Sequence, residues 1–212
     1  MSSIFEHTRK PRGLGGKLMV TLMNAGHRPL ARWGLSHLQL VDHSTVLDVG
    51  CGGGANLAAM RKAFYGGEVV GVDYSAVSVA RAKQVNRAAI AAGQCRVLEA
   101  NVAALPFPSA SFHQVTAFET VYFWPDLVDT FREIRRVLHP GGGFLLCNEA
   151  DGTDPAQERW CQTIGGMRIY TGAQLTAMLH EAGFQEIHID RHPRRHWLCI
   201  TARNALDASY IP

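Results

Sequence analysis

Short apolar runs alternate with amphipathic segments along the chain, and this alternation predicts strands and helices in turn. Runs such as 46–49 and 68–73 have the length and the β-branched content of buried strands. Other segments carry apolar residues at helical spacing, as Leu127, Phe131 and Ile134 do. Strands that alternate with helices favour an α/β fold around a mostly parallel sheet. The predicted strands are 46–49, 68–73, 95–99, 111–118, 144–149, 184–190 and 195–203.

Capping and breaking residues mark the ends of the predicted helices. Ser75 and Asp126 suit N-caps, Thr171 with Gln174 has the form of a capping box, and Pro29 suits a first turn. Two helices are expected before the first strand, one carrying apolar residues 18, 19, 22 and 23 and one beginning near Pro29. A third helix is expected after Gly54, with Leu57, Met60 and Phe64 on one face. A fourth runs from Ser75 to about Gly93 and carries Val79, Ala82, Val85 and Ala89. Two more are expected, one from Asp126 that stops at 139–143 and one from Thr171 to Gly183.

A glycine-rich stretch directly after the first predicted strand is the strongest candidate for a binding site. Asp48 lies in the strand end, where an acid needs a polar partner, and glycines follow at 50, 52, 53 and 54. Glycines let the chain turn sharply, and the N–H groups at the following helix start favour an anionic or polar ligand. Two patterns fit these residues. The dinucleotide fingerprint is satisfied by Gly50, Gly52 and Ala55, and an acid-x-Gly-x-Gly-x-Gly pattern is satisfied from Asp48 to Gly54.

A second acid, Asp73, ends the next predicted strand, 21 residues beyond Gly52. In nucleotide-binding α/β folds this position places a carboxylate beside the ribose of a nucleotide held by the glycine turn. Asp73 therefore supports nucleotide binding, but it does not choose between a nicotinamide cofactor and another adenosyl cofactor.

Composition narrows the class of protein. The chain has 212 residues, of which 47% are hydrophobic, and a net charge of +3, and no basic block long enough to indicate nucleic-acid binding. The five cysteines form no C-x-x-C pair and read as buried thiols in a reducing compartment. No apolar run has the length of a membrane span. We therefore expect a soluble cytoplasmic protein without a nucleic-acid or membrane partner, either a monomer or a homodimer.

The middle of the chain resembles the class I S-adenosylmethionine-dependent methyltransferases of the small-molecule branch. The resemblance rests on the glycine pattern, on Leu105-Pro106-Phe107-Pro108 before a strand, on the helix-to-strand junction Arg136-Val137-Leu138-His139-Pro140-Gly141-Gly142, and on two closely spaced final strands. It covers residues 45–203. It implies a three-layer, doubly wound, Rossmann-like fold with a mostly parallel seven-stranded sheet and an antiparallel C-terminal strand. It also implies S-adenosylmethionine as the cofactor and a small molecule as the methyl acceptor.

The resemblance also assigns roles to residues around the strand ends. Asp48 orients the glycine loop or receives the cofactor's ammonium group, Asp73 takes the ribose hydroxyls, and Asn101 meets the adenine amino group. The family usually has aspartate where this chain has Asn101, whose amide still offers an acceptor oxygen. The complete predicted cofactor set is Asp48, Gly50, Cys51, Gly52, Gly54, Asn56, Asp73, Tyr74, Ser75, Asn101, Val102 and Glu119.

The acceptor side is predicted from the residues that follow the fourth strand. Glu119 and the aromatic run Tyr122, Phe123 and Trp124 stand where ligands of open α/β sheets bind. Glu119 is the first candidate for a general base, and Tyr122 and Trp124 are candidates to present their rings to the sulfonium or to a cationic substrate. The histidines near the C-terminus lie in a strand-turn-strand pattern, so no metal site is expected. Residues 1–40 form a helical segment that either covers the cofactor as a lid or packs on the sheet, and 41–212 form the cofactor-binding domain.

Two other functions are compatible with a glycine turn followed by an acid. A nicotinamide-dependent oxidoreductase would bind NAD(P)H in the same place, although such folds continue with a second βαβαβ half for which this chain is short. A non-catalytic nucleotide-binding module would keep the pocket without turnover.

Overall fold

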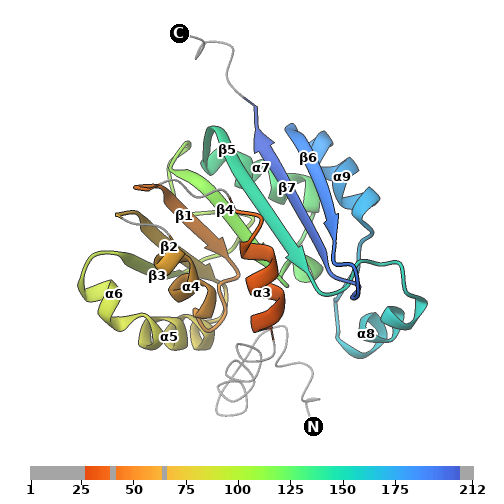
Figure 1. Ribbon diagram of the computed structural model, residues 1–212, viewed down its shortest axis with the longest axis horizontal. Coiled ribbons are helices and arrows are strands. Elements are labelled where there is room, and N and C mark those ends of the chain that lie inside the picture. The colour runs from red at the N-terminus through yellow and green to blue at the C-terminus, as the bar shows by residue number, and fades with distance from the viewer. Residues whose placement is uncertain (1–26, 39–41, 64–65, 206–212) are drawn as a thin grey trace.

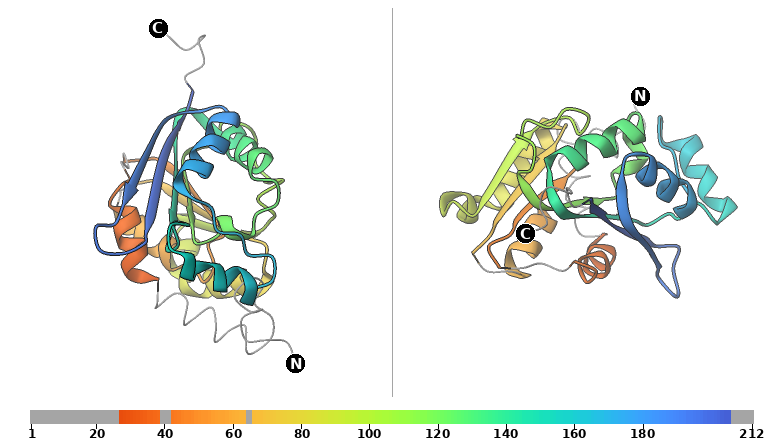
Figure 2. Two further views of the ribbon diagram at one scale, coloured as in Figure 1. Left: turned by 90° about the vertical axis from the view of Figure 1, so that its right-hand side faces the viewer. Right: turned by 90° about the horizontal axis from the view of Figure 1, so that it is seen from above.

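The computed structural model describes residues 27–38, 42–63 and 66–205, and these form a sheet with helices on both faces (Figures 1 and 2). The strand order in the sheet is β3-β2-β1-β4-β5-β7-β6. The strands are β1 (Thr45–Val49), β2 (Glu68–Asp73), β3 (Cys95–Glu99), β4 (Phe112–Phe118), β5 (Leu138–Asn148), β6 (Phe184–Arg191) and β7 (Leu198–Asn204).

The direction of the strands confirms the predicted fold class. Neighbouring strands from β3 to β5 all pair in parallel, whereas β7 pairs antiparallel with both β5 and β6. Only residues 192–197 connect β6 to β7. A parallel connection needs a crossover of about a dozen residues or more, so this short turn forces the antiparallel strand. All carboxyl ends from β1 to β5 therefore meet at one edge of the sheet.

The helices divide between the two faces of the sheet (Figure 2). Side chains alternate along each strand, so Val46 packs under α4 and α5 while Leu47 packs toward α7 and α9. Helix α3 lies on the same face as α4, against β5. The helices are α3 (Arg28–Leu35), α4 (Ala55–Ala63), α5 (Ala76–Val85), α6 (Arg87–Ala91), α7 (Leu127–Val137), α8 (Glu158–Thr163) and α9 (Gly172–Glu181), with 3₁₀ turns at Val121–Phe123 and Pro155–Gln157.

The predicted cap residues act as expected. Ser75, Asp126 and Thr171 each accept a backbone N–H of the first helical turn, and Thr171 forms a complete capping box with Gln174. Pro29 occupies the first turn of α3. The helix expected around residues 18–23 and the predicted core residue Phe64 lie outside the described residues.

The single helix predicted from Ser75 to Gly93 is wrong, because the chain breaks at Asn86 into α5 and α6. The Asn86 side chain donates to the carbonyls of Gly54 at 2.9 Å and Ala82 at 3.0 Å. Val85, the last residue of α5 before the break, is 39% exposed, whereas the helical pattern had placed it with the apolar residues. A partner 32 residues away thus overrides the local helical pattern.

Two predicted strand boundaries also need correction. The strand was expected to begin at residue 144, after a helix stop at 139–143, but β5 begins at Leu138, which pairs with Phe112 before a register shift in the β4–β5 pairing. The last strand begins at Leu198 rather than at Arg195, because residues 192–197 form the turn after β6. Neighbouring strands supply the hydrogen bonds that extend β5, and the local sequence does not reveal them.

Within the described part of the chain, none of the helices combines the length and the apolar character that crossing a bilayer would need.

Candidate active site

The carboxyl ends of the parallel strands open onto a cavity of about 660 Å³. The turn after β1, the end of β2 and the loops after β3 and β4 form its wall, and α3 closes one side (Figure 1). Sites for small molecules in proteins measure about 300–1,000 Å³. The residues of the predicted cofactor set that line this cavity are Gly50, Cys51, Gly52, Asn56, Asp73, Tyr74, Asn101, Val102 and Glu119.

The glycine turn joins β1 to α4 across the end of β2. The N–H groups of Gly50 and Cys51 both donate to the Val72 carbonyl, at 2.8 and 2.9 Å. Gly50 has a φ of +74°, and a Cβ there would lie 2.2 Å from Thr120 Cγ2. Only glycine fits this position, because both the conformation and the space exclude a side chain. A Cβ on Gly52 would meet no atom within 4 Å, so its backbone faces the open cavity.

Asp73 lies at the cavity wall and is held by two backbone donors. Its carboxylate accepts from the N–H of Gly52 at 2.9 Å and from the N–H of Ser75 at 2.8 Å. Burial raises the pKa of Asp73, while these two hydrogen bonds favour its charged form. The carboxylate therefore ties the glycine turn to the start of α5 and fixes its own position at the cavity.

Three residues of the predicted cofactor set do not line the cavity. Asp48 is 1% exposed and lies beneath the glycine turn, where Thr116 donates to its Oδ1 at 2.7 Å. Its Oδ2 has no hydrogen-bond partner among the described residues, and burial raises the pKa of Asp48 to about 7. Gly54 packs against α5, where a Cβ would lie 2.8 Å from the Ala82 Cα. Ser75 is 1% exposed and caps α5.

Tyr74, Asn101 and Val102 follow Asp73 in the chain and also line the cavity. Tyr74 is 37% exposed, and Val102 is nearly buried. The Asn101 amide oxygen accepts the N–H of Ala103 at 3.1 Å, which fixes the side chain in a local turn. The cavity lining therefore includes an aromatic ring, an apolar side chain and an amide.

Glu119 follows β4 directly and has a φ of +61°, a strained conformation for a residue with a side chain. Its Oε1 accepts the Tyr122 hydroxyl at 3.2 Å and the backbone N–H of Glu149. Burial raises the pKa of Glu119 to about 8, although both hydrogen bonds favour the charged form. Strain at a partly buried acid in a cavity wall is a recurrent property of functional sites.

Tyr122 is a buried residue that donates a hydrogen bond to Glu119. The side chain is 3% exposed, and its hydroxyl accepts the N–H of Ala150 at 3.0 Å while it donates to Glu119. The ring does not line the first cavity. In the described structure, Tyr122 therefore acts on the position and charge of Glu119.

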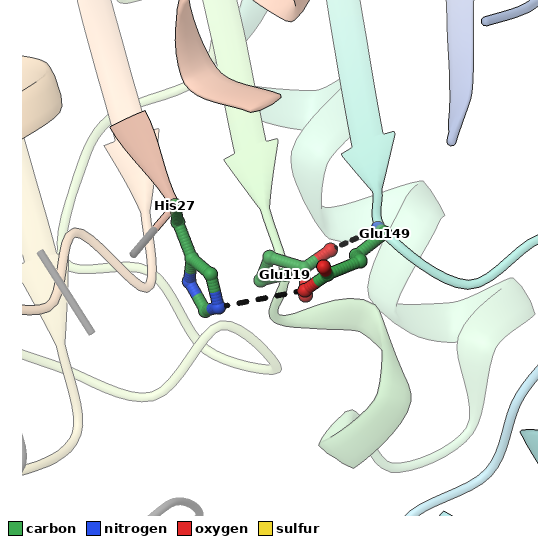
Figure 3. A group of neighbouring side chains, drawn as sticks. All are labelled: His27, Glu119 and Glu149. Atoms are coloured by element: carbon green, nitrogen blue, oxygen red, sulfur yellow. Dashed lines mark hydrogen bonds and ion pairs between the residues drawn. The ribbon is translucent and has the colours of Figure 1, made fainter. Parts of the chain in front are cut away.

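A histidine and a second acid stand beside Glu119 (Figure 3). His27 occupies the N-cap position of α3 without a side-chain capping hydrogen bond, and its Nε2 lies 3.7 Å from the Glu149 carboxylate. Burial lowers the pKa of His27, and the Glu149 charge opposes this. One ligand-type atom from each of His27, Glu119 and Glu149 lies within 4.8 Å of the others, a spacing that could hold a metal ion. The prediction of no metal therefore stays a prediction.

A second cavity of about 580 Å³ adjoins the first. The two cavities share His27, Glu119 and Phe123 in their walls. The remainder of the second cavity comes from Tyr122, from the segment around α8 and from the turn between β6 and β7. Glu119 thus stands at the junction of two spaces, one lined by the glycine turn and one lined by aromatic, apolar and basic side chains.

Sequence reasoning did not single out several residues that matter at the site. Thr116 binds Asp48, and Glu149 binds Glu119 through its backbone and His27 through its side chain. Thr116 could have been identified from the sequence, because a hydroxyl within a buried strand needs a hydrogen-bond partner such as Asp48. An acid directly after the fifth strand, at the same edge as Glu119, was a usable signal for Glu149.

The sheet order and the glycine cavity define a nucleotide-binding α/β domain whose sheet ends in an antiparallel hairpin rather than a second βαβαβ half. Comparison with known proteins agrees. Residues 47–146 match the family model described as a methyltransferase domain. The chain is 30% identical over 166 residues to methyltransferase phqN of Penicillium fellutanum, which covers 74% of this chain and 51% of the relative. It is 35% identical over 151 residues to cycloartenol-C-24-methyltransferase of Arabidopsis thaliana, which covers 67% of this chain and 45% of the relative.

Solved structures show the same fold. A SAM-dependent methyltransferase from Aquifex aeolicus matches with a TM-score of 0.74 at 17% identity, over 89% of this chain and 98% of the other. Geranyl diphosphate C-methyltransferase from Streptomyces coelicolor matches with a TM-score of 0.75 at 17% identity, over 92% and 86%. Residues 47–146 therefore carry a methyltransferase domain, and the fold is that of the class I S-adenosylmethionine-dependent methyltransferases, whose cofactor is S-adenosylmethionine. The chain spans about half the length of the curated relatives it matches.

Proposed function

We propose that this chain transfers a methyl group from S-adenosylmethionine to a small-molecule acceptor. The observation that carries the proposal is the position of Glu119 between the glycine-turn cavity and the second cavity. One space suits the cofactor and the other suits the acceptor, and the acid faces their junction.

The residues of the first cavity fit S-adenosylmethionine chemically. The backbone of the open Gly52 allows close approach to a ligand, and Asp73 offers a carboxylate for the two ribose hydroxyls. Tyr74 and Val102 offer apolar surface for adenine, and Asn101 offers an amide. Asp48 acts from beneath the turn, because its hydrogen bond to Thr116 on β4 fixes the end of β1.

When bound, S-adenosylmethionine would supply a methyl group on a sulfonium: the acceptor's nucleophilic atom would bond to the methyl carbon as the carbon–sulfur bond breaks, and S-adenosylhomocysteine would leave. The protein's contribution is alignment and exclusion of water, and well-aligned intramolecular reactions gain about 7 kcal/mol or more. Glu119 accepts the proton that a hydroxyl or acidic carbon of the acceptor loses, which contributes about 10²–10⁴-fold. Tyr122 and the Glu149 N–H hold the Glu119 carboxylate in place while it does so.

Helix α3 supports a covering role for the N-terminal segment. Leu30 packs with Phe118 and Cys147 on the sheet, while His27, Leu30 and Ala31 also line the first cavity. The helix therefore both packs on the sheet and forms part of the cofactor wall. We propose that residues 1–40 act as a cover of the site and that 41–212 form the cofactor-binding domain.

A small-molecule acceptor is supported by the names of the relatives, which include a sterol 24-C-methyltransferase. The five free cysteines support a reducing, cytoplasmic location. We also propose that the protein is a monomer or a homodimer, which sedimentation at several protein concentrations tests. We propose further that it has no nucleic-acid partner, which titration with RNA and DNA tests.

Isothermal titration separates the proposed function from an oxidoreductase. We expect S-adenosylmethionine and S-adenosylhomocysteine to bind and NADH not to bind. Tight binding of NADH alone would falsify the proposal. Release of S-adenosylhomocysteine over a panel of metabolites tests turnover, and persistent absence of release despite cofactor binding would instead indicate a non-catalytic binding module.

A further inference from the structure

The second cavity has a chemical character that the cofactor does not explain. Its wall away from Glu119 holds two tryptophans and two aliphatic side chains, and one of them, Trp160 on α8, is 37% exposed. An exposed indole at the wall of a cavity is apolar surface available to a ligand. The apolar members of this wall are Trp160, Ile164, Met167 and Trp197.

Two arginines in the same wall are held over these tryptophans. The Arg159 guanidinium lies 5.1 Å from the centroid of Trp160, and the Arg195 guanidinium lies 4.6 Å from that of Trp197. Stacking of this kind limits the freedom of a long side chain and so pre-organises its charge. Neither guanidinium forms an ion pair or a hydrogen bond with any residue that the structure describes.

The acids of the second cavity are engaged elsewhere. Asp154 pairs with His196 at 3.7 Å, and His196 also lies 3.5 Å from the buried Asp151. Glu119 and Glu149 belong to the group around His27, at the junction with the first cavity. The arginines do not line the first cavity. The second cavity therefore has the Glu119 and Glu149 carboxyl groups where the two cavities join. The wall that only the second cavity has carries the two guanidinium groups, and its one acid, Asp154, is paired with His196.

We propose that the methyl acceptor is an amphipathic anion, whose carboxylate or phosphate binds Arg159 and Arg195. Its apolar body packs against Trp160, Ile164 and Met167, and its nucleophilic atom lies at Glu119. Guanidinium groups bind both anions through paired charge-assisted hydrogen bonds, so the two anions share one recognition chemistry. This proposal rests on the proposed function, because it takes the second cavity to be the acceptor site.

The test uses decanoate and decyl phosphate as probes, with decanamide and decylamine as neutral and cationic counterparts of similar length. Isothermal titration is run on the full chain with and without saturating S-adenosylhomocysteine. We expect at least one anion to bind with 1:1 stoichiometry and about tenfold or more tighter than decanamide, because a charge-assisted bond contributes more than a neutral one. The anion that binds more tightly identifies the acceptor's group as carboxylate or phosphate.

Variants assign the binding to the two arginines. We expect Arg159→Gln and Arg195→Gln each to weaken anion binding about tenfold or more and to leave decanamide binding and the affinity for S-adenosylhomocysteine unchanged. Arg194→Gln is the matched control, since Arg194 lies in the same turn but does not line the cavity. Arg195→Glu should shift the preference toward decylamine. Circular dichroism confirms that each variant is folded.

Equal binding of decanoate, decyl phosphate and decanamide to the wild-type protein overturns the anion site. The same conclusion follows if Arg194→Gln weakens anion binding as much as the two cavity variants do. Failure of the wild-type protein to bind S-adenosylhomocysteine is a different result, because it overturns the proposed function rather than the anion site. The measurement without S-adenosylhomocysteine reports on the arginines independently.

Discussion

At the scale of single residues, burial controls the carboxyl groups of the site. The pKa of Asp48, Asp73 and Glu119 is raised in each case, with desolvation as the largest cause. Hydrogen bonds from Thr116, from backbone N–H groups and from Tyr122 oppose the effect. Asp48 and Glu119, whose pKa values are raised to about 7 and about 8, change charge near neutral pH, so pH is an informative variable for activity and stability.

Asp73→Asn should weaken binding of S-adenosylmethionine by about 2 kcal/mol, or about thirtyfold, because hydrogen bonds to a charged acceptor contribute about 1.5–3 kcal/mol. Titration calorimetry measures the change, and thermal unfolding checks the fold, since Asp73 also accepts the N–H groups of Gly52 and Ser75. Asp126→Asn is the control, because Asp126 only caps α7. An unchanged dissociation constant in Asp73→Asn would remove the ribose assignment.

Glu119→Gln should lower turnover on the true acceptor by about 10²-fold or more if the acid takes a proton. The pKa of Glu119 is about 8. The carboxylate therefore forms as pH rises through 8, and kcat/KM of the wild-type enzyme should rise to a plateau above it. The Gln variant should lack this rise. A pH profile that is identical in both proteins would show that Glu119 is not the base.

Asp48 should make folding stability depend on pH. Its pKa is about 7 in the folded protein against 3.8 in a free side chain. The folded state therefore holds the proton more tightly, and the stability from protonated Asp48 is complete below pH 3.8 and is lost as pH rises through 7. Glu119 has the same sign. We expect the midpoint temperature of thermal unfolding to decrease as pH rises from about 5 to about 8, roughly the interval that these pKa shifts define. Asp48→Asn should reduce the slope of the midpoint temperature against pH, and an equal slope in both proteins would contradict this.

At the scale of elements, close contacts between helices and sheet position the site. Gly54 allows α4 to approach α5, and Asn86 locks that contact by donating to the Gly54 carbonyl. Gly34 does the same for α3, since a Cβ there would lie 2.6 Å from Phe118 Cε1 and 2.8 Å from Cys147 Sγ. The first contact supports the glycine turn, and the second keeps α3 against the cofactor cavity.

Gly34→Ala should therefore destabilise the protein by about 1–3 kcal/mol, the usual effect of overpacking a close contact. It should also weaken cofactor binding, because α3 carries the cavity residues His27, Leu30 and Ala31. Gly165→Ala is the matched control, since a Cβ there meets no atom within 4 Å. Chemical denaturation and calorimetry measure both effects. Equal free energies of unfolding for the two variants would contradict this prediction, because they would show that α3 shifts to accept the methyl group at no cost in stability.

At the scale of the whole molecule, the sheet order brings together residues that are far apart in the chain. The turn after β1, the end of β2 and the loop after β4 reach one cavity because β1 lies between β2 and β4. Parallel strands with crossover helices place their carboxyl ends at the same edge. The site is therefore a property of the sheet, and no single segment contains it.

Metal removal tests the chemistry of the group formed by His27, Glu119 and Glu149. We expect turnover and S-adenosylmethionine binding to be unchanged after dialysis against EDTA, because methyl displacement from a sulfonium needs no metal. Activity with and without added Mg²⁺, Mn²⁺ and Zn²⁺ is the measurement. Loss of turnover on chelation and its return with one of these ions would contradict the expectation and would direct attention to these three side chains.

Local patterns predicted most of the fold. The strands, the caps at Ser75, Asp126 and Thr171, and the glycine turn follow from spacing within a few residues, and the structure contains them all. The break at Asn86 was not predictable in the same way, because the carbonyl that its side chain binds belongs to Gly54, directly before α4 and 32 residues away. The extended start of β5 depends on Phe112 in the neighbouring strand.

The candidate site divides similarly. The sequence identified Gly50, Gly52, Asp73 and Glu119, which line the first cavity, because strand ends and turns are visible in the chain, but it did not single out Glu99, which lines the same cavity. It did not show that Tyr122 would turn its hydroxyl to Glu119, or that His27 and Glu149 would stand beside it. Nor did it show that Arg159 and Arg195 would share a wall with Trp197. These contacts depend on how distant segments fold against one another.

By itself, the sequence determined the identity of each strand, the glycine turn and the acids at the strand ends, since periodicity and turn chemistry act over a few neighbouring residues. The tertiary structure decided which of these residues face a cavity, which lie buried beneath it as Asp48 does, and what stands on the far side of Glu119. The physical reason is that exposure, pKa and contact arise from the packing of segments that are separated along the chain, and the sheet alone brings those segments together.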